Sequence, residues 1–473
     1  MSFTIAEFLF LGFSVFFAIY YLLLRGKKTK KLTEPFLLVT SLAVYSVGAG
    51  WKTGLLLALT CLLTKWAGDL LFHSHSRLRL AVFITLALCP LFLFKYLNFL
   101  LGTLNTVLHT AFSAGDWAAP LGISFITFSV LSYLIDVYRG EEPGSILSTG
   151  LYVLFFPKIL SGPIVRWKEF RQKWALRCVS VDLTEQGVRR LMMGFIKKAV
   201  LADSFGVTAT MIGSGVPNGV DAPSIVLMGF CMMFQIYFDF SGYSDIALGL
   251  SNMLGVSWKE NFHFPYLSTS VSDFWRRWHI SLSSWLKDYL YISLGGNRKG
   301  KIRTYMNLMI TMLLGGLWHG ASISFILWGA LHGIALAAHK FIMGHFSSFK
   351  ALGCEMKPWR RVLGVLITFH VVCFGWILFR ATSMKAVGEM LRQIFTNFHP
   401  EVFMQFVLGY KGVFALMVIG YVLHFMPKRS EDALRGVVTR SPLLIQAAIL
   451  AIAIFIVVQF KSAGVQPFIY FQF

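Results

Sequence analysis

Residues 222–256 read APSIVLMGFCMMFQIYFDFSGYSDIALGLSNMLGV, and this stretch decides the class of fold. Apart from Asp239 and Asp245 it carries no charge, over more than the roughly 20 residues that a helix needs to cross a bilayer. The whole chain has the same character, with 56% hydrophobic residues, 14% charged residues and a mean hydropathy of +0.65. Soluble domains carry about 25% charged residues. The composition excludes a disordered chain and an ordinary soluble enzyme, and it predicts an all-α, polytopic membrane protein.

Other apolar runs recur along the chain, and we expect about 11–13 transmembrane helices in total. The runs lie at 4–24, 33–50, 53–72, 80–113, 118–137, 147–164, 222–256, 304–343, 362–380, 405–425 and 442–460. Residues 166–203 are amphipathic and basic, which predicts helices on the cytoplasmic surface. Residues 257–296 mix aromatic and charged side chains, which predicts a re-entrant segment buried within the protein.

Lys and Arg number 43 against 22 Asp and Glu, a formal net charge of +21. In a membrane protein this excess first indicates positive cytoplasmic loops and attraction to membrane lipid, so we expect no nucleic-acid partner. The basic block at 25–31 places the N-terminus outside, and the alternation of spans then leaves the C-terminus outside as well. The six cysteines contain no CxxC pair, so we expect neither a disulfide framework nor a metal site.

Three polar clusters interrupt the apolar sequence, where an ionisable side chain at the bilayer centre costs about 2.5–3.5 kcal/mol. The clusters are FDFSGYSD at 238–245, SDFWRRWH at 272–279 and GGLWHGA at 315–321. If the second cluster is helical, Ser272, Arg276 and His279 share one face, and Asp273 can pair with Arg277. A structural ion-pair network would explain these charges too, and the acids of the first cluster could equally be scaffold.

His319 in the third cluster is the strongest catalytic candidate. It follows Arg303 by 16 residues, so helix rise places it roughly 24 Å from the basic cytoplasmic loop. The flanking glycines let a substrate or a second backbone approach closely. A neutral imidazole is a natural general base for a hydroxyl group. A hydrogen-bonded structural histidine is the alternative, but a second histidine, His279, and the neighbouring tryptophans favour a functional role.

The motifs together resemble the membrane-bound O-acyltransferases, and within them the bacterial branch that acetylates alginate. The resemblance covers nearly the whole chain and implies a single domain at 1–473 with a catalytic core at about 118–345. The motifs are FDFSGYSDIALG (238–249), NFHFPYLSTSVSDFWRRWHISLSSWLKDYLYISLGGNRKG (261–300), GGLWHGAS (315–322), PLGISFITFSVLSYLIDVYRG (120–140) and FFPKILSGPIVR (155–166).

The resemblance implies roles for particular residues. His319 corresponds to the family's catalytic histidine, and His279 to its second polar motif residue. Side chains that would support the site or line a tunnel are Trp318, Trp275, Asp273, Arg276, Asp239 and Asp245. Side chains that would face the phosphates of the donor are Arg298, Lys299, Lys301 and Arg303. The C-terminal tail at 468–473 resembles an acyl-carrying tail, in which Tyr470 would be a covalent relay. An aromatic anchor at the membrane interface is the alternative.

The implied activity is transfer of an acetyl group from cytoplasmic acetyl-CoA, a substrate rather than a bound cofactor, across the bacterial inner membrane. The acceptor would be an exported envelope polysaccharide of the alginate, peptidoglycan or cellulose type. A secreted or periplasmic SGNH-type acetyltransferase would be the partner. Three alternatives stay open: D-alanyl transfer to teichoic acid, a proton-coupled transporter or flippase, and a structural subunit of an export complex.

Overall fold

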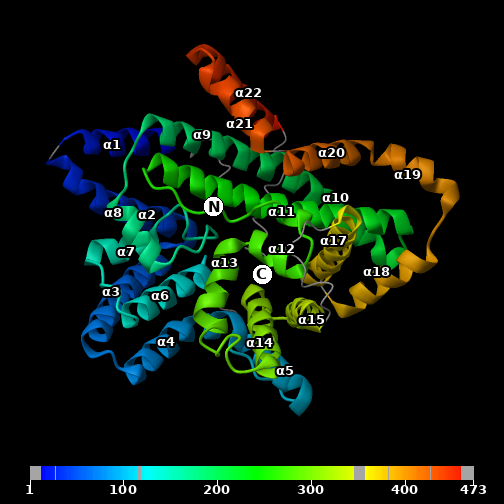
Figure 1. Cartoon of the computed structure of the whole chain (residues 1–473), viewed down its shortest axis with the longest axis horizontal. Coiled ribbons are helices and arrows are strands. Elements are labelled where there is room, and N and C mark those ends of the chain that lie inside the picture. The colour runs from blue at the N-terminus through cyan, green and yellow to red at the C-terminus, as the bar shows by residue number, and fades with distance from the viewer. Residues whose placement is uncertain are drawn as a thin grey trace. The chain divides into compact units, whose positions relative to one another are not determined.

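The computed structural model describes residues 12–26, 28–115, 119–345, 357–381, 383–426 and 428–459. Every regular element within these residues is helical, which confirms the predicted all-α architecture (Figure 1). The helices form two compact units that alternate along the chain. The first unit extends to Val188 and includes Ala247–Lys259. The second comprises Arg189–Ile246 and the described residues from Glu260 onward.

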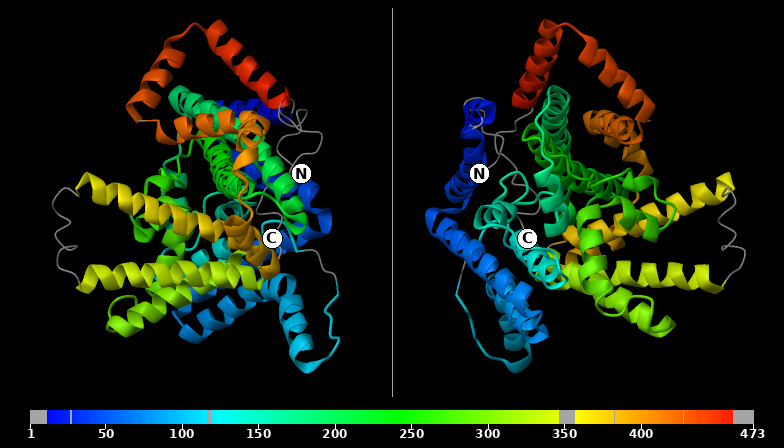
Figure 2. Two further views of the ribbon diagram at one scale, coloured as in Figure 1. Left: turned by 90° about the vertical axis from the view of Figure 1, so that its right-hand side faces the viewer. Right: turned by 60° about the vertical axis from the view of Figure 1, so that its left-hand side comes forward.

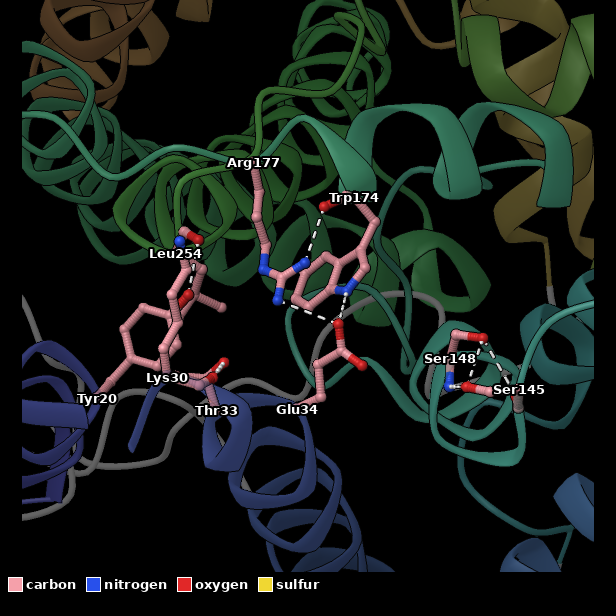
Figure 3. A network of polar contacts seen from close by, with 9 residues as sticks. All are labelled: Tyr20, Lys30, Thr33, Glu34, Ser145, Ser148, Trp174, Arg177 and Leu254. Carbon is pink, nitrogen blue, oxygen red and sulfur yellow. Dashed lines mark hydrogen bonds and ion pairs between the residues drawn. The ribbon is translucent and has the colours of Figure 1, made fainter. Parts of the chain in front are cut away.

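The first unit is built around α3, which packs against α2, α6 and α7, while α4 packs against α6. Its helices are α1 (Phe13–Arg25), α2 (Thr33–Ala49), α3 (Trp51–Ser74), α4 (Arg77–Leu91), α5 (Leu97–Leu108), α6 (Ile123–Tyr138), α7 (Ile146–Leu154) and α8 (Trp167–Ala175). Figure 3 shows a polar network in this unit that centres on Glu34, in the first turn of α2. Glu34 Oε1 accepts hydrogen bonds from Trp174 Nε1 and Arg177 NH2, both at 3.0 Å. The network ties α2 to the end of α8.

The second unit is organised around α15, which packs against α14, α12 and α17. Figure 2 shows α15 and α17 as two long helices alongside each other. The helices are α9 (Val181–Phe195, begun in the first unit), α10 (Asp203–Gly215), α11 (Ala222–Met253, completed in the first unit), α12 (Val271–Arg277), α13 (Ile280–Trp285), α14 (Lys301–His319), α15 (Ile323–His345), α17 (Pro358–Arg380), α18 (Met384–Thr396), α19 (Phe403–Gly409), α20 (Lys411–Phe425), α21 (Lys428–Arg440) and α22 (Leu443–Gln459).

Seven helices in the described residues are long and apolar enough to cross a membrane, or eight if the bent pair α19–α20 forms one span, so the chain is a multi-pass membrane protein. They cover Thr29–Ala49, Trp51–Ser74, Arg77–Leu108, Val181–Asn218, Ala222–Met253, Ile323–His345 and Pro358–Arg380. The expected 11–13 spans exceed this number because several apolar runs form shorter helices. The run at 80–113 gives one long candidate span, and the run at 147–164 gives only α7 and a non-helical segment.

Residues 166–203 were predicted to form helices on the cytoplasmic surface, and their second half begins a continuous helical segment, Val181–Asn218, that is long and apolar enough to be a candidate span. Its lysines are paired rather than solvated. Lys197 Nζ lies 2.7 Å from Asp245, and Lys198 Nζ lies 2.7 Å from Asp239, both on α11. Because each ammonium group meets a carboxylate, the helix can be buried in spite of its basic character.

The close approach of α14 and α15 depends on glycines at their contact. A Cβ at Gly316 would overlap the Phe325 carbonyl oxygen, and one at Gly329 would lie 2.5 Å from the Met312 carbonyl oxygen. Small residues that bring two backbones together are typical of helix pairs in membranes. The backbone contact fixes the end of α14, where His319 lies.

Replacing Gly329 with alanine should separate α14 from α15, since the added methyl group meets the backbone of the facing helix. Overpacking of this kind costs about 1–3 kcal/mol, and we expect a lower midpoint of thermal unfolding in detergent. Gly344→Ala is the matched control on the same helix, because a Cβ there has nothing within 4 Å. Equal midpoints for the two variants would contradict the packing argument.

Candidate functional site

His319 is the last residue of α14, and its side chain is buried among aromatic rings of the second unit. Its ring centroid lies 4.9 Å from that of Trp318 and 5.1 Å from those of Trp328 and Phe379, all in edge-on geometry. The helix ends here because Gly320 is extended, and a Cβ at Gly320 would overlap the Phe325 ring. The glycines beside His319 therefore make room for α15 and its aromatic side chain.

His279 lies at a break between α12 and α13, so the expectation that Ser272, Arg276 and His279 share one helical face is wrong. Helix α12 ends at Arg277, and His279 has a left-handed backbone with φ of +42°. Two backbone hydrogen bonds hold the break in place, from Ile280 N to Asn261 O and from His263 N to Arg277 O, both at 2.9 Å. These long-range bonds replace the helical ones that a local pattern would predict.

Asn261 orients His279, and sequence reasoning missed it. Its Oδ1 accepts from the Ser281 backbone N–H at 3.1 Å and from Ser281 Oγ at 2.9 Å, and it lies 3.3 Å from His279 Nδ1. Since Oδ1 can only accept, His279 Nδ1 carries the proton and Nε2 keeps its lone pair. No described residue bonds to that Nε2, and the whole residue is buried. The only sequence signal was an amide in the aromatic stretch NFHFPY.

The two histidines lie near a shared tryptophan. The ring of Trp318 is 4.9 Å from that of His319 and 6.3 Å from that of His279, centroid to centroid. The ring of Trp328 contacts those of both His319 and His332, at 5.1 and 4.8 Å between ring centroids. His332 is fully buried, and neither of its ring nitrogens bonds to a described residue.

Three of the charged candidates, Asp273, Asp239 and Asp245, lie in ion pairs. The predicted Asp273–Arg277 pair is confirmed, with 3.0 Å between Arg277 Nε and the carboxylate. Arg276 is exposed, whereas Trp275 packs against His332 at 5.2 Å. On α11, Asp239 and Asp245 each meet a lysine of the long α9–α10 segment. This arrangement fits the scaffold interpretation of the two acids.

The donor-facing candidates form an exposed basic group at the start of α14, made of Arg298, Lys299, Lys301 and Arg303. No acid in the described part of the chain pairs with them. The described residues of the chain hold no group of three or more His, Cys, Asp or Glu side chains that could bind a metal ion. The predicted relay residue Tyr470 and the tail at 468–473 lie outside the described residues.

Residues 3–384 match the family model of MBOAT, the membrane-bound O-acyltransferase family. The chain belongs to this family and is an O-acyltransferase. The buried histidines at the end of α14 and at the α12–α13 break fall within the matched region.

Curated relatives in bacteria share the family. The chain is 40% identical to "Probable alginate O-acetylase AlgI" of Pseudomonas aeruginosa, over 84% of this chain and 75% of that protein. It is 33% identical to the "Peptidoglycan O-acetyltransferase" of Helicobacter pylori, over 68% and 65% of the two chains. It is also 30% identical to the "Teichoic acid D-alanyltransferase" of Bacillus subtilis, over 55% and 68%.

Replacing Asn261 with alanine should lower turnover, because His279 loses the acceptor that fixes its tautomer and ring orientation. We expect a fall of about 10–100-fold in acyl transfer per folded molecule, the range known for side chains that orient a functional group through a hydrogen bond. Asn307→Ala is the matched control, since Asn307 is equally buried but donates to the carbonyls of Leu294 and Gly296.

Both asparagine variants should lose stability, so turnover is normalised to folded protein measured by size-exclusion chromatography. An equal loss of turnover in both would make Asn261 an ordinary structural residue. Asn261→Asp, which keeps an acceptor oxygen, should recover part of the activity.

Proposed function

We propose that this protein transfers an acetyl group from cytoplasmic acetyl-CoA across the bacterial inner membrane for O-acetylation of an exported cell-envelope polysaccharide. The observation that carries the proposal is the placement of His279 and His319 about the ring of Trp318, in buried aromatic surroundings. Relatives named for alginate and peptidoglycan acetylation support an acetyl group and a polysaccharide acceptor.

The proposed chemistry assigns His319 as general base. As its imidazole accepts the proton of the acceptor hydroxyl, the oxygen attacks the thioester carbonyl, the new C–O bond forms, and the C–S bond breaks. The thiolate of coenzyme A leaves and takes up the proton that His319 holds. His279 Nε2, whose lone pair is turned away from Asn261, would accept a hydrogen bond from the acceptor and orient it. The buried aromatic side chains would exclude water, which protects the thioester from hydrolysis.

The proposed donor site begins at the basic group formed by Arg298, Lys299, Lys301 and Arg303. Unpaired exposed cations suit the phosphates of coenzyme A, and helix α14 joins them to His319 at its other end. Both chain termini would lie outside. Tyr470 in the C-terminal tail would take the acetyl group from the donor within the protein and carry it to the outer side. A secreted or periplasmic SGNH-type acetyltransferase would then move it to the polysaccharide.

A second candidate function is D-alanyl transfer to teichoic acid, because a relative with that name shares 30% identity. The buried histidines would serve either thioester equally well. The two candidates differ in the donor, which a transfer assay can supply separately.

His319→Ala should abolish transfer while the protein still inserts and folds, since the general base is removed and its aromatic neighbours stay. We expect a loss of at least about 10²-fold in labelled acetyl transfer from acetyl-CoA, measured with purified protein in proteoliposomes. A donor carrying D-alanine on a carrier protein tests the second candidate in parallel. Near-normal transfer by a well-folded His319→Ala variant with either donor would overturn the assignment of His319.

Tyr470→Phe should abolish acetylation of the polymer, because phenylalanine keeps the ring and removes the hydroxyl that would carry the acetyl group. Polymer acetylation in cells is the measurement, with membrane protein levels quantified alongside. Phe471→Tyr serves as a control, because it changes a neighbouring ring and leaves Tyr470 intact. Full acetylation by Tyr470→Phe would rule out the relay.

A further inference from the structure

The segment FFPKILSGPIVR at 155–166, between α7 and α8, is buried over almost its whole length although it forms no regular helix. Its turn is tight around Lys158. The Gly162 backbone N–H donates to the Lys158 carbonyl at 3.0 Å, and a Cβ at Gly162 would overlap Lys158 Cα. The turn therefore holds Lys158 in a fixed position within the first unit.

Lys158 is a buried cation with no acidic partner among the described residues. It is 5% exposed, and its Nζ lies 4.3 Å from the centre of the Tyr152 ring and 5.9 Å from that of Phe170. The rings stabilise a positive charge, but burial lowers the pKa of the ammonium group to about 7. Acids in this region are paired elsewhere: Glu141 with Lys168 and Arg171, Glu142 with Arg171, and Glu169 with Lys173.

Ser161 places a second buried polar group in the same turn. It is 1% exposed, and its Oγ bonds to no described residue. A buried hydroxyl without a hydrogen-bond partner destabilises the fold. Lys158 and Ser161 are both donors, and a single anion can accept from an ammonium group and a hydroxyl at once.

The surroundings favour a phosphate group close to the membrane surface. Trp174 and Trp258 each stack on the ring of Phe170, at 5.4 and 5.7 Å between ring centroids. Tryptophans gather at membrane–water interfaces. Helix α8 follows directly and is short, basic and amphipathic, as interfacial helices are. Basic residues of this kind mark the cytoplasmic side.

We propose that Lys158 and Ser161 form a binding site for a phosphate group, such as that of an anionic phospholipid head group or of a soluble phosphate ester. The Lys158 ammonium would pair with one phosphate oxygen, and the Ser161 hydroxyl would donate to another. The site belongs to the first unit, whereas the histidines belong to the second. It does not depend on which acyl group the enzyme transfers.

The test is a titration of the purified, delipidated full-length protein in a neutral detergent and a phosphate-free buffer. The probes are dioleoylphosphatidylglycerol, sodium phosphate and dioleoylglycerol, which has no phosphate. The midpoint of thermal unfolding is measured at each probe concentration. The readout is the maximal shift of this midpoint and the probe concentration that gives half of that shift. Lys158→Met and Ser161→Ala remove the two donors. Lys168→Met is the control, because Lys168 is an exposed lysine of α8 paired with Glu141.

We expect wild type and Lys168→Met to be stabilised by a phosphate-bearing probe and not by dioleoylglycerol. Lys158→Met should raise the half-maximal concentration about 10–100-fold, as expected for the loss of a charge-assisted hydrogen bond. A response to phosphatidylglycerol alone assigns the site to a lipid head group, and a response to free phosphate assigns it to a soluble ligand.

An equal response to dioleoylglycerol would overturn the proposal, and so would a wild-type response of the Lys158→Met variant. If Lys158→Met does not yield folded protein, Ser161→Ala decides, with a several-fold rise in the half-maximal concentration expected. An unchanged value for Ser161→Ala would then overturn the proposal.

Discussion

The second unit depends on the ion pair between Lys198 and Asp239. Between two apolar helices, a charged side chain is tolerated only when an opposite charge lies beside it. Leaving one partner alone in such a place costs about 3–5 kcal/mol. Lys198 falls in the π-helical segment Ile196–Ala202, whose wider turn brings consecutive side chains toward α11. Helix α11 also carries Phe240, whose ring meets that of His279 at 4.5 Å. The helix that receives the charges therefore also supports the candidate site.

Sequence reasoning succeeded where the structure depends on local spacing. The Asp273–Arg277 pair follows from a separation of four residues on a helix, and His319 is marked by the glycines that end its helix. Reasoning failed where the deciding partner lies elsewhere in the chain. Asn261 holds His279 across a break that no periodicity reveals.

The basic segment after residue 181 shows a second limit of pattern reading. The sequence of an amphipathic helix with lysines on one face is the same whether that face contacts water or the carboxylates of another helix. Here the pattern predicted contact with water, and Lys197 and Lys198 instead pair with carboxylates of α11. The glycines around His319 raise the same question. Sequence alone predicted an approach by a substrate or by a second backbone, and the structure fills that space with α15 and the Phe325 ring. The sequence predicts that the lysines need polar surroundings and that the glycines allow a close approach. Only the folded structure shows which groups lie there.

Two tyrosines of α1 carry a consequence for the order of assembly at the ribosome. Tyr20 and Tyr21 donate hydrogen bonds to the carbonyls of Leu254 and Met253, at 3.0 and 3.1 Å (Figure 3 shows the first). The partners of the Tyr20 bond are separated by 234 residues. At about 5–20 residues per second the second partner emerges roughly 12–47 s after the first. During that interval the two tyrosine hydroxyls of α1 lack the backbone carbonyls that accept from them in the folded protein.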